Sequence, residues 1–255
     1  MRFFLTELIK TTVDDIVVKD RQNIEVKDKL ASDVVTDKDI AVERFIKQKL
    51  LERFPKDRFI GEEEDSEKGL SNKRTWVLDP IDGTLNYTKD MPYFGTQLAL
   101  YEKGVPMLCV IYLPILNEMY YAEQGQGAFL NGKRLKSDPN LSVQKSIITF
   151  GDFSKSNPIS RPVQVNMMSK LMEEALKIRI QGASSVDFAF VAAGRSGAHV
   201  MFSKRIWEIS AGLLLCLEAG CVTNVSEDMS ETLEGKGVVV AQNSKILEQI
   251  MVMLE

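Results

Sequence analysis

Apolar residues recur at helical spacing in several stretches of the chain. In residues 3–18, Phe4, Leu8 and Ile16 follow roughly this spacing, which predicts an amphipathic first helix that serves as scaffold. Helical periodicity, or an apolar run closed by a glycine, predicts further helices over 39–51, 163–176, 186–193, 209–219 and 244–254. Helices are therefore expected along the whole length of the chain.

Short apolar runs between the helices predict strands. They lie at residues 59–60, 76–78, 97–101, 107–113, 119–122, 128–130, 147–150, 178–180, 201–202 and 238–241. Glu102-Lys103-Gly104 predicts a hairpin after the third of these strands, and Asn131-Gly132 predicts the turn of a hairpin formed by 119–122 and 128–130. The polar segment 27–38 predicts a loop. No long linker or repeat separates these elements, which indicates one α/β unit.

The stretch Thr75–Thr88 combines a predicted strand with two aspartates. The strand 76–78 is expected to end at Asp79-Pro80, because proline cannot donate to a sheet ladder. Asp82 follows, and Gly83-Thr84 can open a helix with free backbone N–H groups. Carboxylates this close repel unless a cation lies between them, and a divalent ion there could also hold a phosphate oxygen. An Asx-type turn between a strand and a helix is the alternative.

Other acidic residues also lie where predicted elements begin or end. Asp33, Asp37 and Asp39 precede or open the helix at 39–51, where N-capping and the helix dipole explain them equally well. Gly61-Glu62-Glu63-Glu64 follows a strand and can direct one carboxylate into a cleft, or form a solvated acidic turn. Glu208 near a helix start can likewise be a partner of the helix dipole.

The composition is that of an ordinary soluble globular protein, without the basic stripe typical of a nucleic-acid-binding protein. The 255 residues are 44% hydrophobic and 27% charged, and the net charge of −4 comes from interspersed charges of both signs. Three cysteines without zinc-type spacing argue against a disulfide framework and for a reducing compartment. The N-terminal stretch becomes acidic before a signal-peptide core forms, so a cytoplasmic location without membrane association is expected. With His199 as the single histidine, catalysis has to use carboxylates, hydroxyls and metal ions.

Four motifs together resemble the inositol monophosphatase family. They are FIGEEE at 59–64, WVLDPIDGTLNYT at 76–88, GAFLNGKRL at 127–135 and WEISAGLLLCLEAG at 207–220. The resemblance implies an α/β (α+β) fold, the layered α/β/α/β/α sandwich shared with fructose-1,6-bisphosphatase. It also implies a homodimer and a lithium-sensitive type of metal-dependent phosphatase. We expect residues 1–140 to form an N-terminal lobe with most metal ligands, and residues 141–255 to form a lobe that completes the substrate pocket.

The resemblance also assigns roles to particular residues. It places the metal ligands at Glu62, Asp79, the backbone carbonyl of Ile81, Asp82 and Glu208, with two or three Mg²⁺ ions expected and Mn²⁺ as an alternative. Oxygen ligands without His or Cys suit these ions. By the same resemblance, Glu62 and Thr84 activate the attacking water, and Asp39, or else Asp37, orients the Thr84 hydroxyl. The residues expected to contact phosphate or substrate are Asp82, Gly83, Thr84, Gly182, Ala183, Ser184, Met201 and Glu208.

Two residues depart from the family pattern. Glu208 stands where the family usually has aspartate, and its extra methylene moves the carboxylate by roughly 1 Å. Met201 stands where inositol-hydrolysing members carry a glutamate, and methionine cannot accept the same hydrogen bond. His199 is interpreted as a structural residue. Catalysis is therefore expected to be retained, with altered sugar recognition.

Three functions remain open at this stage. The first is Mg²⁺-dependent hydrolysis of inositol monophosphate or a related small polyol or sugar phosphate. The second is fructose-1,6-bisphosphatase or 3′(2′),5′-bisphosphate nucleotidase activity. The third is a non-catalytic binding or regulatory role, whose expected signature is a lost metal ligand.

Overall fold

Two β-sheets form the framework of the protein. The computed structural model describes residues 1–21, 24–28, 34–64, 69–153, 161–203, 205–225 and 237–254. The larger sheet has seven strands in sequence order: β3 (Arg58–Gly61), β4 (Thr75–Asp82), β5 (Gly95–Glu102), β6 (Val105–Leu113), β7 (Glu118–Glu123), β8 (Gly127–Leu130) and β9 (Lys133–Arg134). All its neighbouring strands are antiparallel except β3 and β4, which run parallel.

The smaller sheet comes from the second half of the chain. Its order is β11 (Lys177–Arg179), β10 (Ile147–Phe150), β12 (Ala198–Met201), β14 (Val238–Ala241) and β13 (Val222–Thr223), with parallel pairing of β10 to both β11 and β12. A separate ribbon pairs β1 (Val26–Asp28) with β2 (Val34–Thr36). The predicted boundary between lobes near residue 140 stays a prediction.

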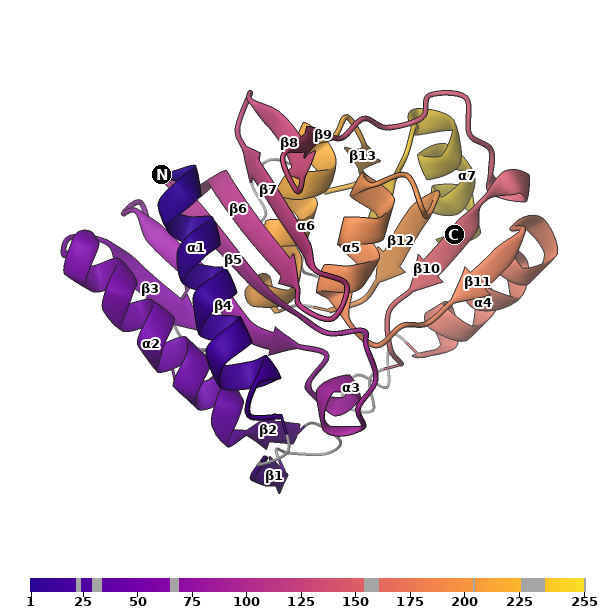
Figure 1. Ribbon diagram of the computed structural model, residues 1–255. Helices are drawn as coiled ribbons and strands as arrows, with labels where there is room; N and C mark the ends of the chain where they lie inside the picture. The colour runs from indigo at the N-terminus through magenta and orange to yellow at the C-terminus, as the bar shows by residue number, and fades with distance from the viewer. Residues whose placement is uncertain are drawn as a thin grey trace.

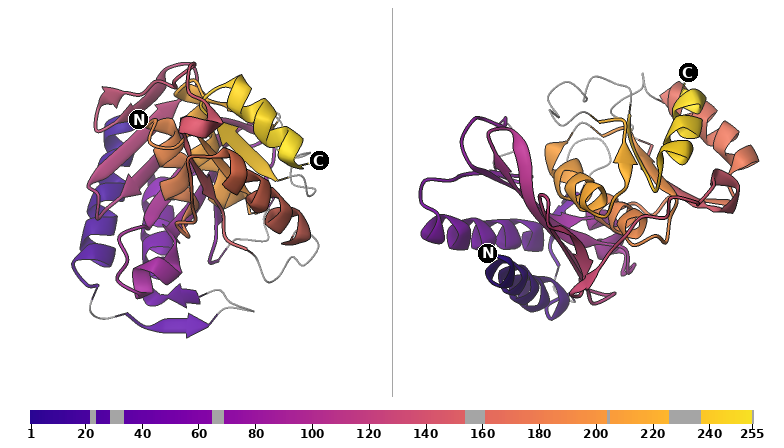
Figure 2. Two further views of the ribbon diagram at one scale, coloured as in Figure 1. Left: turned by 90° about the vertical axis from the view of Figure 1, so that its right-hand side faces the viewer. Right: turned by 90° about the horizontal axis from the view of Figure 1, so that it is seen from above.

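Helices cover and separate the two sheets, as Figures 1 and 2 show. On the outer face of the larger sheet lie α1 (Arg2–Val13), continued by a π-helical turn at Asp14–Val18, and α2 (Asp37–Arg53). Between the sheets lie α5 (Ser184–Ala192) and α6 (Ile206–Glu218), and on the far face of the smaller sheet lie α4 (Arg161–Glu174) and α7 (Ser244–Leu254). This is the predicted layered α/β/α/β/α sandwich.

Each interface between layers has its own apolar core. Leu5, Ile46 and Trp76 belong to the core between the outer helices and the larger sheet. Residues of α5 and α6 pack with both sheets in the central core, and a third core lies beneath α4 and α7. Because burying apolar surface is the main favourable term in folding, these three cores fix the positions of the strand ends and helix starts that carry the candidate site.

Several sequence predictions need correction in this region. The strand expected to stop at Asp79-Pro80 continues to Asp82, with a bulge where the register of β4 against β5 shifts. The pairing of β3 with β4 ends at Gly61 and Leu78, so Pro80 lies beyond it and its missing N–H costs no bond to β3. The segment 27–38, expected to be a loop, contributes both strands of the β1–β2 ribbon in its described part.

The hairpin turn near residue 131 was also placed wrongly. β7 and β8 are joined by residues 124–126, whereas Asn131-Gly132 turns β8 into β9. Both residues of this dipeptide have positive φ, which is the requirement of a two-residue hairpin turn. Asn131-Gly132 therefore forms a hairpin turn as predicted, but between β8 and β9 instead of between β7 and β8.

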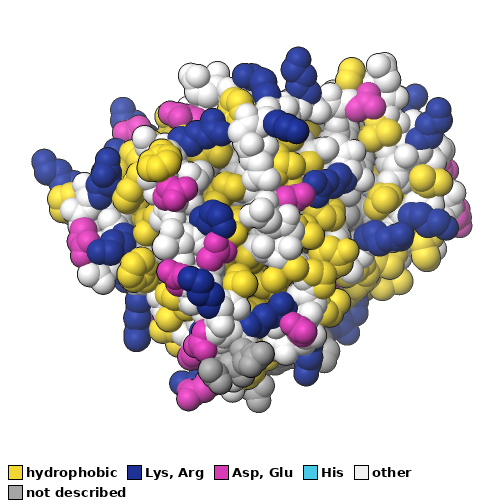
Figure 3. Space-filling view, in the orientation of Figure 1, with side chains coloured by type: hydrophobic (Ala, Val, Ile, Leu, Met, Phe, Trp, Pro, Cys, Tyr) yellow, Lys and Arg dark blue, Asp and Glu magenta, His cyan; other side chains and the backbone are white. Residues whose placement is uncertain are grey.

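The surface seen in Figure 3 carries lysine and arginine side chains interspersed with acidic ones. This agrees with the charge pattern of the sequence. Cys109, Cys216 and Cys221 are buried and free. None of the described helices combines the length and the apolar composition needed to cross a membrane.

Candidate active site

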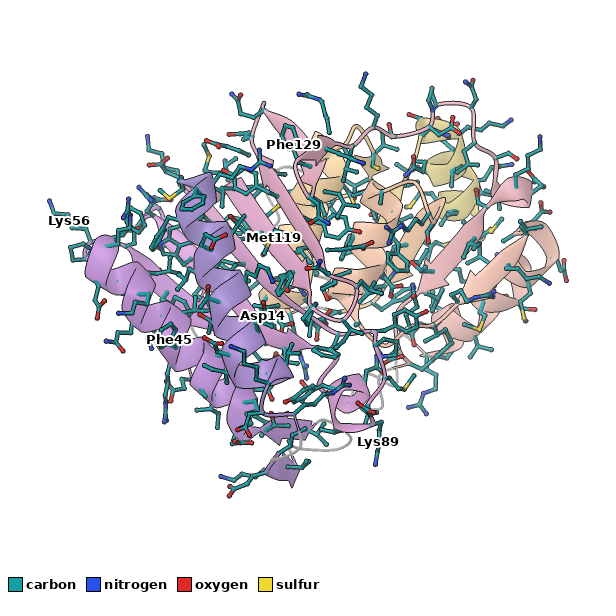
Figure 4. The ribbon with its side chains drawn as sticks, viewed as in Figure 1. Asp14, Phe45, Lys56, Lys89, Met119 and Phe129 are labelled. Atoms are coloured by element: carbon teal, nitrogen blue, oxygen red, sulfur yellow. The ribbon has the colours of Figure 1, made fainter. Side chains whose placement is uncertain are left out.

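The candidate site forms where β4 ends, α2 begins and the short helix α3 (Thr84–Thr88) follows. These elements lie together at the lower side of Figure 1, and Lys89 marks the end of α3 in Figure 4. The bulge in β4 places Asp79 opposite Gln97 and Asp82 opposite Gly95 on the neighbouring strand. Both aspartates are buried, at 1% and 8% exposure.

Asp39 and Thr84 are joined directly across two helices. The Thr84 hydroxyl lies 3.1 Å from Asp39 Oδ1 and 2.8 Å from the Ile81 carbonyl oxygen. The other oxygen of Asp39 accepts from the backbone N–H and the hydroxyl of Thr36, completing a capping box at the start of α2. Asp39 therefore contacts Thr84 and caps a helix at the same time, so both interpretations of its sequence position apply.

Asp37 faces elsewhere. Its carboxylate accepts a hydrogen bond from the Glu25 backbone N–H at 2.9 Å and lies 3.3 Å from the Lys38 ammonium. Of these two aspartates, Asp39 is the one that contacts Thr84. Asp33, the third acid of this segment, lies outside the described residues.

Asp82 is held by the start of α5. Its Oδ2 accepts from the Ser185 backbone N–H at 2.6 Å, and the Ser184 hydroxyl lies 3.3 Å from its Oδ1. The same hydroxyl lies 2.8 Å from the carbonyl oxygen of Glu208 at the start of α6. Ser184 thus connects β4, α5 and α6.

The loop before α5 packs against the loop before α3. Gly83 has a φ of +83°, and a Cβ there would lie 2.9 Å from the Ala183 Cβ and 3.2 Å from the Gly182 carbonyl oxygen. The Asn86 amide donates to the carbonyls of Tyr93 and Gln181, at 2.7 Å each. The structure therefore brings Gly83, Gly182 and Ala183 together, and only glycine fits the conformation and the space at position 83.

Glu62 follows β3 and is positioned by a residue that the sequence analysis missed. Glu43 on α2 is completely buried and accepts from the backbone N–H groups of Glu63 and Glu64, at 2.9 Å each. A Cβ at Gly61 would lie 2.2 Å from the Glu43 carboxylate carbon, so glycine leaves the room for this contact. The available signal was a glutamate four residues after Asp39, on the same helical face as the buried Val42 and Ile46.

Glu208 lies in the first turn of α6 and keeps 22% of its side-chain surface exposed. Arg205, at the N-cap of the helix, places its Nη1 atom 3.2 Å from Glu208 Oε1 and 3.8 Å from Glu62 Oε1. No sequence motif pointed to Arg205. Glu208 thus faces the same space as Glu62, although Glu62 follows strand β3 and Glu208 lies on helix α6.

Met201 and His199 lie on β12. Met201 is 5% exposed and belongs to the central apolar core, so its expected contact with substrate stays a prediction. His199 is completely buried, its Nδ1 lies 2.9 Å from the Thr149 hydroxyl, and burial lowers its pKa to about 3. A neutral, buried histidine agrees with the structural interpretation.

Burial and mutual repulsion raise the pKa values of the acidic side chains. Burial raises the pKa of Asp39 and of Asp82 to about 6, and that of Glu208 to about 7. The pKa of Asp79 is raised well above its ordinary value by burial and then by the charges of Glu62, Asp82, Glu208 and Asp39. The four neighbouring carboxylates therefore raise the pKa of Asp79, and a cation bound beside it would lower that pKa.

The residues present fit a hard divalent cation. Asp79 Oδ1 is buried and finds no hydrogen-bond donor among the described residues, which is a costly state for a carboxylate oxygen. The surrounding donors are carboxylate and carbonyl oxygens, which Mg²⁺ and Mn²⁺ prefer. Within the described ranges, no three His, Cys, Asp or Glu side chains are already grouped so that they could hold one metal ion. Joint coordination by these acids would require side chains to reorient.

Comparison with known proteins places the chain in a family. The model of the inositol monophosphatase family matches residues 4–254. An inositol-1-monophosphatase of Rhizobium meliloti (strain 1021) is 33% identical over 90% of this chain and 85% of its own length. The Nus factor SuhB of Escherichia coli (strain K12) is 32% identical over 89% and 85%. A fructose-1,6-bisphosphatase/inositol-1-monophosphatase of Thermotoga maritima is 36% identical over 74% and 70%.

Solved structures agree with this match. The Thermotoga maritima IMPase superposes with a TM-score of 0.85 at 28% identity, covering 98% of this chain and 95% of its own. An IMPase/NADP phosphatase complexed with Mg²⁺ and phosphate superposes with a TM-score of 0.82 at 25% identity, covering 95% and 90%. The fold, the order of the motifs and the full-length match lead to one conclusion: this chain belongs to the inositol monophosphatase family.

Proposed function

We propose that this protein is a divalent-metal-dependent phosphatase that hydrolyses monoesters of small polyols or sugars, with inositol monophosphate as the reference substrate. Family membership supports the phosphatase activity. The observation that carries the metal dependence is Asp79, a buried carboxylate with an unpartnered Oδ1 atom beside four other acids. The similar IMPase/NADP phosphatase was solved with Mg²⁺ and phosphate, which supports the same ion for this chain.

Glu62, Asp79, Asp82, Glu208 and the Ile81 carbonyl are the residues that would hold Mg²⁺ or Mn²⁺. When bound, such an ion polarises the phosphoryl oxygens and lowers the pKa of a coordinated water. Gly83 and Thr84 offer backbone N–H groups toward the phosphate, and the loop at Gly182-Ala183 closes the same side of the site.

The Thr84 hydroxyl has a defined polarity in this arrangement. Its single hydrogen is donated to Asp39 or to the Ile81 carbonyl, so its oxygen is left as an acceptor. That acceptor can orient an O–H bond of the attacking water, while Glu62 takes the proton. Direct attack of this water on phosphorus, in line with the leaving alcohol, needs no phosphoenzyme intermediate.

A panel of phosphate esters tests the proposal and the choice of substrate. We would measure phosphate release with Mg²⁺ and with a chelator from inositol 1-phosphate, fructose 1,6-bisphosphate, glucose 1-phosphate, phosphoadenosine phosphate and NADP. We expect hydrolysis with Mg²⁺ only, preference for one ester class, and loss of activity in Asp82→Asn. Preference for fructose 1,6-bisphosphate would support the bisphosphatase alternative, and preference for phosphoadenosine phosphate would support the nucleotidase alternative.

The alternative to an enzyme activity is a non-catalytic binding or regulatory role, because one similar protein is named a Nus factor. Its expected signature is a lost metal ligand, yet this chain keeps an acid at each of the four carboxylate positions. Absence of hydrolysis of every ester with both Mg²⁺ and Mn²⁺ would contradict the phosphatase proposal and favour this role.

A further inference from the structure

Arg205 is a cation already present beside the acidic side chains of the candidate site. Its Nη1 atom lies 3.2 Å from Glu208 Oε1 and 3.8 Å from Glu62 Oε1. The two glutamates belong to different elements, since Glu62 follows β3 and Glu208 lies in the first turn of α6. One guanidinium therefore joins the larger sheet to a helix that packs between the sheets.

The two glutamate carboxylates are largely removed from water, at 13% and 22% side-chain exposure, whereas the arginine side chain is 45% exposed. Charges of the same sign at such positions repel, and a cation between them removes this cost. Arginine suits this task, because its planar group presents several donors to two carboxylates at once. The arginine thus supplies part of the compensation that a divalent ion would supply.

We propose that Arg205 is an internal counter-ion that competes with the divalent cation for Glu208. In the metal-free protein it holds Glu62 and Glu208 together, and it releases Glu208 when that carboxylate binds a metal ion. Arg205 thereby lowers the affinity of the metal position to which Glu208 would contribute. This inference rests on the proposed metal dependence, and it adds a residue that determines how readily the site fills.

The backbone around Arg205 fits such an exchange. The Arg205 backbone N–H donates to the Ser203 hydroxyl at 3.1 Å, and the Glu208 backbone N–H donates to the Arg205 carbonyl at 3.1 Å. The start of α6 is therefore held by backbone contacts that do not involve the guanidinium. The Arg205 side chain is 45% exposed, so the guanidinium borders solvent where it contacts Glu208.

Calorimetric titration of the metal-free protein with Mn²⁺ tests this inference. We would compare wild type with Arg205→Met, Arg205→Lys and the matched control Arg44→Met. Arg44 forms an ion pair with Glu64, in the same turn as Glu62, with its Nη2 atom 2.6 Å from Glu64 Oε1. The control removes one arginine charge near the site without removing the contact with Glu208.

We expect Arg205→Met to bind Mn²⁺ about fivefold more tightly than wild type, and the other two variants to stay within about twofold. Without metal, Arg205→Met should melt at a lower temperature than wild type, and saturating Mn²⁺ should remove the difference. Equal or weaker Mn²⁺ binding by Arg205→Met, or an equal gain in Arg44→Met, would overturn the inference. Absence of Mn²⁺ binding by wild type would overturn the proposed metal dependence together with it.

Discussion

Thr84 Oγ1 lies 3.1 Å from Asp39 Oδ1, and this contact joins α3 to the first turn of α2 across 45 positions of sequence. Asp39 is buried, and its second carboxylate oxygen is engaged by Thr36. The other carboxylate oxygen, Oδ1, is therefore the one that contacts Thr84. We propose that Asp39 is a positioning residue that holds the Thr84 hydroxyl through this contact.

Asp39→Asn should lower kcat about 100-fold with little change in KM. The amide oxygen can still accept from Thr36, which leaves the amide N–H group to donate to the Thr84 oxygen and occupy the acceptor that the attacking water needs. Steady-state kinetics with saturating Mg²⁺ would measure the effect. Asp37→Asn is the matched control, because Asp37 contacts Glu25 and Lys38 instead. Equal losses in the two variants would contradict the assigned role.

Glu43→Gln should reduce the free energy of unfolding by about 1–3 kcal/mol. Glu43 accepts from the backbone N–H groups of Glu63 and Glu64 in a completely buried position. A glutamine has one acceptor oxygen, so one buried N–H group loses its partner. Urea denaturation measures the change, and Glu52→Gln on the exposed side of the same helix should have almost no effect. A Glu43 variant as stable as wild type would argue against this contact.

Protonation of the buried acids should stabilise the metal-free protein, and this contribution to the free energy of unfolding should fall as pH rises. The pKa values of Asp39 and Asp82 are raised to about 6 and that of Glu208 to about 7, so the folded state holds more protons than the unfolded state from about pH 4 to about pH 7. The unfolding free energy therefore decreases through this window as pH increases.

Thermal melts of Asp82→Asn beside wild type in a chelator isolate one of these groups. The variant cannot ionise at position 82, so its melting temperature relative to wild type should be higher at about pH 8 than at about pH 5. The asparagine oxygen can still accept from the Ser185 backbone N–H at both pH values. A difference between the two proteins that does not change with pH would show that Asp82 ionises equally in both states.

The sequence predicted the elements whose apolar period is strong. The helices over 39–51, 163–176 and 209–219 were found within a few residues, because one face of each packs against a sheet. The course of β4 through Pro80 was missed, because the rule that proline ends a strand fails where the neighbouring strand has already stopped.

The site was predictable where a motif is local and not where it depends on distant contacts. Asp79, Asp82, Gly83 and Thr84 lie within six residues, so their proximity follows from the chain itself. The helical face of Glu43 indicates that this residue is buried, but sequence spacing predicts neither its contact with the backbone 20 positions away nor the approach of Arg205 to Glu62. Choosing Asp39 over Asp37 required the actual direction of each side chain.

The central claim is that the buried acids are arranged for a divalent cation rather than for stability. Asp79→Asn tests it most directly, beside Asp57→Asn. Asp57 is a buried aspartate of the opposite kind, because its carboxylate accepts from Trp76 Nε1 at 2.9 Å and lies 3.2 Å from the Arg74 guanidinium. Each protein would be melted in a chelator and in Mg²⁺, and its Mg²⁺-dependent phosphate release would be measured.

Asp79→Asn should melt at a higher temperature than wild type in the chelator, gain little from Mg²⁺, and release phosphate on the order of 1,000-fold more slowly. Asp57→Asn should show the reverse, with a lower melting temperature and retained activity per folded molecule. An Asp79→Asn protein that is destabilised without metal, yet active and still stabilised by Mg²⁺, would contradict the account.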